Sequence, residues 1–198
     1  MKWSIINKQS LYDGFFKLTQ INLKHDLFAG GESPTIRREL IEKGNAVGVL
    51  PYDPIRDEIV LVEQFRIGAA AAEDKNNPWV LEIIAGYQEP DESPEEVVCR
   101  EAIEEAGCEI SALESMYKFY TSPGGSSEQV EIFFARVDTS DVNGIHGLDE
   151  EGEDIKVHVI SSMQAFEWLE SGRIDSAMPI IALQWFRANR ERVRELWL

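Results

Sequence analysis

Residues 86–107 read GYQEPDESPEEVVCREAIEEAG, a polar segment followed by a helix with a well-marked start. Ser93, Pro94 and Glu96 match an N-cap serine, a proline in the first helical turn and a glutamate at the third helical position, which is the capping-box pattern. Gly107 is a typical residue for ending a helix. The stretch therefore predicts a loop that leads into a helix of about three to four turns.

Three glutamates crowd the end of this helix: Glu101, Glu104 and Glu105. Offsets of three and four residues place them on one face, where like charges repel, and the negative end of the helix dipole adds to the repulsion. The opposite, packing face is expected to consist of Cys99, Ala102, Ile103 and Ala106. Arg100 is the only cation of this helix, whereas a solvated helix face usually carries several cations among its acidic residues. Two interpretations stay open: a solvated acidic face, or a site for Mg²⁺ or Mn²⁺.

The formal charge of the 198-residue chain is −17. Such acidity argues against nucleic acid as a partner, and the alternative interpretation is that it only confers solubility. It also disfavours a phosphorylated substrate, unless metal cations lie between the substrate and the protein. A phosphorylated substrate is therefore expected only together with a metal site.

The chain shows no apolar run of membrane-spanning length, and residues 1–10 lack the apolar core of a signal peptide. No membrane partner is expected. Cys99 and Cys108 would lie roughly 13 Å apart along a helix, which is beyond disulfide reach. A reducing, cytoplasmic location is expected.

Apolar periodicity predicts an α/β (α+β) chain. The first third is rich in strand patterns, and a possible boundary lies near Gly44. A polar loop is expected at 70–78 and an acidic loop at 143–154. Strands are predicted at 15–25, 39–53, 59–62, 78–87, 116–125, 129–138 and 155–160, and further helices at 161–172 and 178–197.

From Gly86 the polar residues follow a fixed spacing: glycine, five residues, glutamate, seven residues, then R-E-x-x-E-E-x-G. This pattern resembles the Nudix box, the signature of hydrolases that cleave nucleoside diphosphates linked to another moiety. Every polar position matches, namely Gly86, Glu92, Arg100, Glu101, Glu104, Glu105 and Gly107. Ala102 and Cys108 stand where larger aliphatic residues are usual. The resemblance implies a mixed β-sheet sandwiched between helices.

The same resemblance implies roles for the acidic residues. Two to three Mg²⁺ ions, or Mn²⁺ in their place, would be held by the carbonyl of Ala85 and the carboxylates of Glu101, Glu105 and Glu153. Glu104 would assist at a metal directly or through water. Arg100 would hold a glutamate by a charge-assisted hydrogen bond, and Glu92 would tether the loop, unless it is only solvated.

Outside the box the chain resembles the bacterial ADP-ribose pyrophosphatases over nearly its whole length. The stretches that carry this are GFFKL, RREL with Lys43 downstream, VEQFRI, SPGGSSE and HGLDEEGEDIKVHV. Such enzymes hydrolyse ADP-ribose to AMP and ribose 5-phosphate, and they are homodimers that exchange N-terminal β elements. The resemblance therefore implies an N-terminal antiparallel β element at 1–44, exchanged in a homodimer, and a Nudix hydrolase domain at 45–198.

These stretches also imply a mechanism and a substrate site. Glu151 would be the general base that activates water for attack on one phosphorus, unless its loop is merely a charged surface. In SPGGSSE, Ser122, Pro123 and Gly124 would bring backbone close to the substrate and Glu128 would accept hydrogen bonds from ribose hydroxyls, unless the segment is only a turn.

The remaining candidates surround the substrate in the same way. The diphosphate and adenosine would be contacted by Arg38, Glu39, Lys43 and Arg66, although both arginines could equally form surface ion pairs. At least one of Phe15 and Phe16 would come from the partner subunit and stack on adenine, unless both are core residues. Tyr87 would line the pocket.

Three alternatives to an ADP-ribose hydrolase remain open. The first is a Nudix enzyme for another nucleotide sugar, such as GDP-mannose. The second is a catalytically silent Nudix domain that senses nucleotide sugars, although such domains usually lose box glutamates that this chain retains. The third, a purely structural acidic domain, leaves the box unexplained.

Overall fold

The computed structural model describes residues 1–73 and 77–198, and these fall into two compact units. One unit comprises residues 1–45 and 119–130, and the other comprises residues 46–118 and 131–198. Each unit is a separate body with its own sheet pairing, so each is described by itself.

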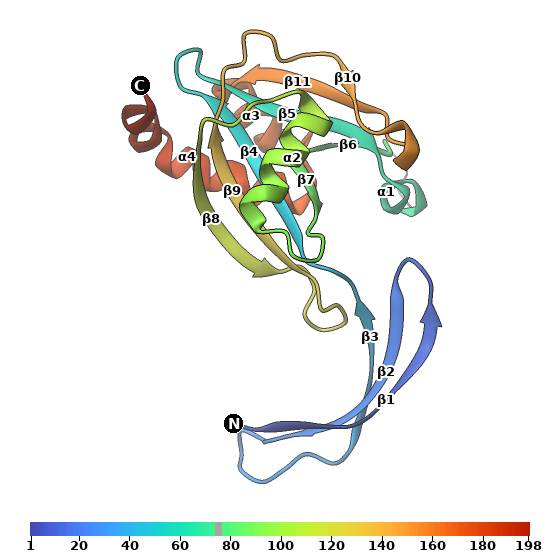
Figure 1. The fold of residues 1–198 in the computed structure, drawn as a ribbon. Helices are drawn as coiled ribbons and strands as arrows, with labels where there is room; N and C mark the ends of the chain where they lie inside the picture. The colour runs from blue at the N-terminus through green and yellow to red at the C-terminus, as the bar shows by residue number, and fades with distance from the viewer. Residues whose placement is uncertain (74–76) are drawn as a thin grey trace. The chain divides into compact units, whose positions relative to one another are not determined.

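The larger unit is built on a sheet that has eight strands among the described residues (Figure 1). The strands are β4 (Ala46–Asp53), β5 (Glu58–Phe65), β6 (Trp79–Glu82), β7 (Ile84–Tyr87), β8 (Ala112–Tyr120), β9 (Gln129–Arg136), β10 (Ile145–His146) and β11 (Ile155–Ser161). Their order is β10-β11-β5-β4-β9-β8, while β6 pairs with β5 and β7 pairs with β4. The ends of β8 and β9 belong to the smaller unit.

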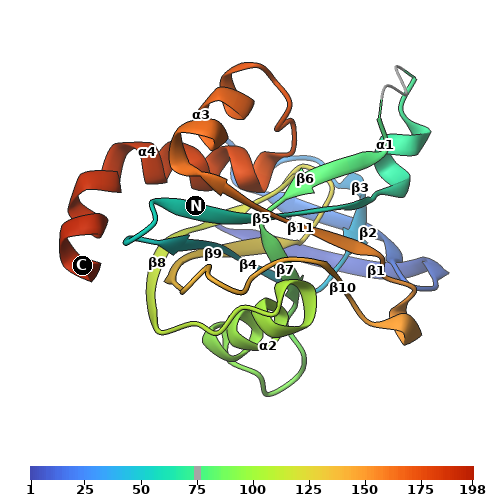
Figure 2. The same cartoon turned by 90° about the horizontal axis from the view of Figure 1, so that it is seen from above.

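Helices cover both faces of this sheet, as Figure 2 shows: α2 (Pro94–Ala106) lies on one face, and α3 (Ser162–Glu170) and α4 (Ala177–Trp197) lie on the other. On the α2 face, Val60 and Val62 of β5 pack in one buried cluster with Val98 and Ala102 of α2. On the opposite face, buried aromatic rings of β4, β9 and α4 stack together. The expected α/β sandwich is confirmed.

Helix α2 begins and ends where the sequence predicts. Ser93 and Glu96 form the reciprocal capping box, and Gly107 ends the helix with a φ of 62°, a conformation that glycine adopts at little cost. The predicted packing face is partly wrong, because Cys99 is exposed and Ile103 is 57% exposed.

The helix is rotated relative to that expectation. It packs through Val97, Val98, Ala102 and Ala106, and this places Glu105 against the sheet, where it is only 2% exposed. Residues 98, 102 and 105 share a face at offsets of four and three. Glu105 is thus buried because α2 packs against the sheet through Val97 and Val98.

Asp53 closes the turn between β4 and β5. The backbone N–H groups of Ile55, Arg56 and Thr139 donate to its carboxylate, and so does the Arg56 guanidinium. Burial alone would raise the pKa of Asp53, but these donors outweigh it and lower the pKa from 3.8 to about 2.

Stability should therefore depend on Asp53 in acid. The folded-state pKa lies below the unfolded one, so the stabilisation is present above pH 3.8 and is lost as the pH falls towards about 2. It amounts to about 2 kcal/mol. Urea unfolding of the wild type and of Asp53→Asn between pH 6 and about 2 measures it. The difference between the two proteins should shrink by that amount in acid, and parallel curves would contradict the account.

The smaller unit contains a three-stranded antiparallel sheet of β1 (Trp3–Asp13), β2 (Lys17–His25) and β3 (Ile36–Glu42). Residues 119–130 join it through the Ile41 N–H, which donates to the Gly125 carbonyl at 2.8 Å. Across β1, β2 and β3, all of them described, Thr19 and Ile21 are the buried residues. The sheet has little core of its own.

The remaining differences from the predicted elements are local. Strand β1 was not predicted, because its side chains do not alternate between apolar and polar. The predicted strand at 78–87 is two short strands, β6 and β7, which pair with different neighbours. The predicted loop at 70–78 begins within α1 (Ile67–Ala71), and its residues 74–76 lie outside the described part of the chain. None of the described helices is both long and apolar enough to cross a bilayer.

Candidate active site

Arg100 lies at the centre of the box residues. Its guanidinium donates twice to Glu92, at 3.0 and 3.2 Å, once to Glu101 at 2.7 Å, and once to Glu104 at 3.0 Å. It also donates to the carbonyl of Tyr87 at 3.4 Å. One cation therefore ties the loop before α2 to two glutamates of the helix, which fits the orienting role expected for Arg100 and the tethering role expected for Glu92.

Glu101 lies directly over Gly86 at the end of β7. A Cβ atom at position 86 would come within 1.6 Å of the Glu101 Oε1 atom, so any side chain there would displace the carboxylate. The glycine is therefore required for close approach rather than for a special backbone angle. The close approach of Glu101 explains why the first residue of the box is a glycine.

Glu105 points into the sheet. The Ala85 N–H donates to its Oε2 atom at 3.0 Å. Burial raises the pKa of the Glu105 carboxyl to about 8; the Ala85 N–H opposes this rise, and the charges of Glu101 and Glu153 add to it. Burial also raises the pKa of Glu101, against the hydrogen bond from Arg100. Low solvent access and neighbouring carboxylates thus both disfavour the charged forms of Glu101 and Glu105.

The acidic loop is docked on the end of α2. The Gly147 N–H donates to the Glu104 carbonyl at 3.1 Å. Leu148 and Glu153 close the loop reciprocally, since the Leu148 N–H donates to the Glu153 carboxylate at 3.1 Å and the Glu153 N–H to the Leu148 carbonyl at 3.2 Å. Glu151 is exposed in the short helix η1 (Asp149–Glu151). The loop therefore places Glu153 near the box carboxylates and leaves Glu151 facing solvent.

The donor set suits a hard divalent cation. Glu101, Glu105 and Glu153 offer only oxygen atoms, and a cation among them would offset both the burial and the like charges that raise the pKa values of Glu101 and Glu105. Across residues 1–73 and 77–198, however, no three acidic, His or Cys side chains converge closely enough to hold an ion. Arg100 is the cation that Glu101 and Glu104 contact here.

Arg66 also faces this region. Its guanidinium donates to Glu82 at 2.8 Å, and its charge acts on Glu105 in the direction that lowers the pKa of that carboxyl. Glu82 is 8% exposed and was not among the predicted site residues. An acidic residue that ends the apolar run WVLE is the sequence signal that could have identified it.

Tyr87, at the end of β7 in the larger unit, is 40% exposed, and the other predicted substrate residues belong to the smaller unit. Lys43 pairs with Glu128 at 2.7 Å, and its ammonium lies 5.5 Å from the centre of the Phe16 ring. Phe15 and Phe16 contact each other edge to face, and Phe15 is 84% exposed. The rest are exposed residues: Arg38, Glu39, Ser122, Pro123 and Gly124. The predicted site residues therefore form two clusters, one in each unit.

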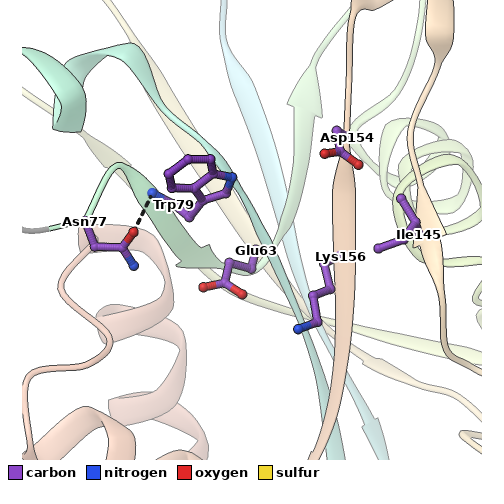
Figure 3. A pocket seen from close by; sticks show the side chains of 6 residues that line it. All are labelled: Glu63, Asn77, Trp79, Ile145, Asp154 and Lys156. Atoms are coloured by element: carbon purple, nitrogen blue, oxygen red, sulfur yellow. Dashed lines mark hydrogen bonds between the residues drawn. The ribbon is translucent and has the colours of Figure 1, made fainter.

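A cavity of about 330 Å³ in the larger unit includes none of the predicted residues (Figure 3). It is lined by Glu63, Asn77, Trp79, Ile145, Asp154 and Lys156. Glu63 pairs with Lys156 across β5 and β11, and neighbouring Val62 and Val157 pack with α2. Side chains alternate along a strand, so Glu63 and Lys156 point to the face opposite α2. The cavity is separate from the carboxylate cluster.

Comparison with known proteins agrees with this geometry. The chain is 47% identical over 194 residues to an ADP-ribose pyrophosphatase of Haemophilus influenzae, covering 98% of this chain and 89% of that protein. It is 47% identical over 193 residues to an ADP-ribose pyrophosphatase of Escherichia coli, with 98% and 91% covered. A GDP-mannose pyrophosphatase of an Enterobacter species is 32% identical over 191 residues, with 96% and 97% covered.

The fold also has a solved counterpart. A crystal structure described as an ADP compounds hydrolase superposes with a TM-score of 0.73 at 20% identity, covering 98% of this chain and 97% of the other. The model of the NUDIX domain matches residues 42–178, well over half of the chain. With the box residues gathered around Arg100 on the predicted loop and helix, the chain therefore belongs to the NUDIX domain family.

Proposed function

We propose that this chain hydrolyses the diphosphate of ADP-ribose to AMP and ribose 5-phosphate with the help of Mg²⁺ or Mn²⁺. The observation that carries the proposal is the complete set of box glutamates, of which Arg100 binds Glu92, Glu101 and Glu104, in a chain 47% identical over nearly its whole length to ADP-ribose pyrophosphatases. A catalytically silent sensor would not need this complete set of glutamates, and such domains usually lose some of them.

Different residues of the larger unit would bind the metal ions and orient the carboxylates. Glu101, Glu105 and Glu153, with the carbonyl of Ala85, would hold the ions, and Glu104 would assist directly or through water. When bound, the ions would neutralise the diphosphate and act as Lewis acids on the phosphoryl group. Arg100 keeps Glu101 and Glu104 in place by charge-assisted hydrogen bonds.

Proton transfer falls to the acidic loop. Glu151 would remove a proton from the attacking water, since it is exposed on a loop that is itself docked on the end of α2. Arg66, fixed by Glu82, would contact the phosphate groups, because a guanidinium pairs bidentately with phosphate oxygens. Binding and chemistry are thereby assigned to different side chains.

We also propose that the segment 1–44 is exchanged in a homodimer. All eleven residues of β1 are exposed, and apolar side chains such as Trp3 (71% exposed) and Tyr12 (63% exposed) lack cover in the single chain. An uncovered sheet of this kind is typical of a surface that a second copy buries. In such a dimer Phe15 or Phe16 would stack on the adenine held by the partner subunit.

Sedimentation equilibrium at micromolar concentration tests the dimer. We expect a single species of twice the chain mass, and removal of residues 1–44 should shift it to a monomer. A full-length protein that sediments as a monomer would contradict the exchange, and with it the assignment of Phe15 and Phe16 to a shared site.

A substrate panel tests the activity against its nearest alternative. The purified protein is incubated with Mg²⁺ and either ADP-ribose or GDP-mannose, and kcat/KM is measured for each from the nucleoside monophosphate released. We expect a higher kcat/KM for ADP-ribose than for GDP-mannose. A preference for GDP-mannose would support the alternative suggested by the 32% identical relative.

A further inference from the structure

The Glu128 carboxylate is held at both of its oxygen atoms. The Lys43 ammonium lies 2.7 Å from Oε1, and the Thr121 hydroxyl donates to Oε2 at 2.9 Å. The Glu128 side chain is 13% exposed, whereas Thr121 lies at the surface. A glutamate that needed only solvation would not be fixed by two different donors.

The two donors are themselves fixed by backbone pairing within the smaller unit. The Ser127 N–H donates to the Ile41 carbonyl at 3.1 Å, and the Lys43 N–H donates to the Ser127 hydroxyl at 3.3 Å. The Thr121 N–H donates to the Glu128 carbonyl at 3.4 Å. Lys43 and Thr121 therefore approach Glu128 from segments that these hydrogen bonds hold together, and the carboxylate has one preferred orientation.

The Glu128 carboxylate can still accept hydrogen bonds from a ligand. An ionised carboxylate accepts about four hydrogen bonds, so the bonds from Lys43 and Thr121 leave roughly two acceptor positions, one on each oxygen. Two adjacent hydroxyl groups of a sugar match such a pair. The charge of Lys43 also offsets that of Glu128, which lowers the repulsion of an anionic substrate. The Phe16 ring beside Lys43 adds an apolar wall.

We propose that Thr121 and Lys43 are positioning residues that aim the Glu128 carboxylate at a vicinal diol of the substrate's sugar. The inference rests on the proposed function and on the expectation, from the family resemblance, that Glu128 accepts hydrogen bonds from ribose hydroxyls. It gives Lys43 a different task from the diphosphate contact expected from the family resemblance. It also assigns a role to Thr121, which no motif in the sequence had singled out.

Titration calorimetry of ADP-ribose binding in EDTA tests these positioning roles in the absence of turnover. Thr121→Val removes the donor but keeps the shape, and the Kd should rise about five- to tenfold, the effect of one hydrogen bond. Thr121→Ser keeps the donor and should bind like the wild type. Thr35→Val, at another exposed threonine of the same unit, is the matched control and should leave the Kd unchanged.

Deoxy analogues separate positioning from a general structural effect. Two analogues are used, one lacking a hydroxyl on the adenosine ribose and one lacking it on the terminal ribose. For the analogue that has lost the hydroxyl bound by Glu128, Thr121→Val should cost less than twofold, while the other analogue should show the full loss. Lys43→Met should follow the same pattern as Thr121→Val.

The outcomes are distinct. Equal Kd values for Thr121→Val and the wild type would overturn the inference, and so would equal losses on ADP-ribose and both analogues. A wild type that binds ADP-ribose with this pattern yet releases no AMP when Mg²⁺ is added would sink the proposed function and leave the inference standing. A wild type that neither binds ADP-ribose in EDTA nor hydrolyses it with Mg²⁺ would overturn both, and one that hydrolyses it with Mg²⁺ but does not bind it in EDTA would overturn the inference alone.

Discussion

Replacing Glu105 with glutamine is expected to abolish ADP-ribose hydrolysis while making the metal-free protein more stable. The amide keeps the size of the side chain and can still accept the hydrogen bond from the Ala85 N–H, but it is a poor ligand for Mg²⁺. Loss of one metal ligand should remove several kcal/mol of transition-state stabilisation, on the order of 10³-fold in kcat.

The gain in stability follows from the sign of the pKa shift. Burial raises the pKa of Glu105 from 4.5 to about 8, so the carboxyl favours folding below pH 4.5 and this contribution is lost as the pH rises towards 8. The Gln variant avoids that loss, and its advantage over the wild type should grow between pH 5 and 8. Urea unfolding in EDTA measures the advantage.

Glu109→Gln supplies the control for both readouts. It removes the same charge from an exposed position just beyond the helix. Activity and stability should stay close to wild type. If Glu105→Gln turned over ADP-ribose normally, the assignment of Glu105 as a metal ligand would be wrong.

Replacing Glu151 with glutamine is expected to slow kcat by about 10²–10⁴-fold, the usual cost of losing a general base. Glu151 is exposed and its backbone N–H, not its side chain, closes the turn to Leu148, so the loop should keep its conformation. Because the carboxylate is assigned to proton transfer and not to the ions, Mg²⁺ affinity measured by calorimetry should not change.

Glu150→Gln tests whether Glu151, and not its neighbour, is the general base. Glu150 is the preceding residue of the same short helix and is also exposed. It should retain nearly full activity. A large loss at Glu150 with none at Glu151 would move the general base by one position, and a weakened Mg²⁺ affinity in Glu151→Gln would assign that residue to the metal site.

The loop and helix of the box were predictable because local chemistry determines them. Ser93, Pro94 and Glu96 specify the start of α2 through hydrogen bonds within four residues, and Gly107 specifies its end. The offsets of the glutamates follow from the helical repeat alone. These features need no knowledge of what the helix packs against.

The rotation of α2 was not predictable in the same way. Periodicity placed Cys99 and Ile103 on the packing face, yet the sheet accepts Val97, Val98 and Ala102, and Glu105 is buried with them. Which apolar stripe is buried depends on the shape of β4, β5 and β11, which lie far from the helix in the sequence. Burial of a charged residue is the feature that helical periodicity misses.

Contacts between distant segments explain the other omissions. Glu82 holds Arg66 across 16 positions, and Lys43 reaches Glu128 from a segment that is far away in the chain. A motif lists residues by spacing, whereas these pairs are set by sheet pairing. Strand β1 was missed for a related reason: its side chains are exposed on both faces of the single chain, so no alternation marks it.

One measurement tests the central claim directly. The purified protein is incubated with ADP-ribose, once with Mg²⁺ and once with EDTA, and the products are separated by anion-exchange chromatography. The account predicts AMP and ribose 5-phosphate in equal amounts with Mg²⁺ and neither product with EDTA. Intact ADP-ribose after incubation with Mg²⁺, or the same products in EDTA, would contradict it.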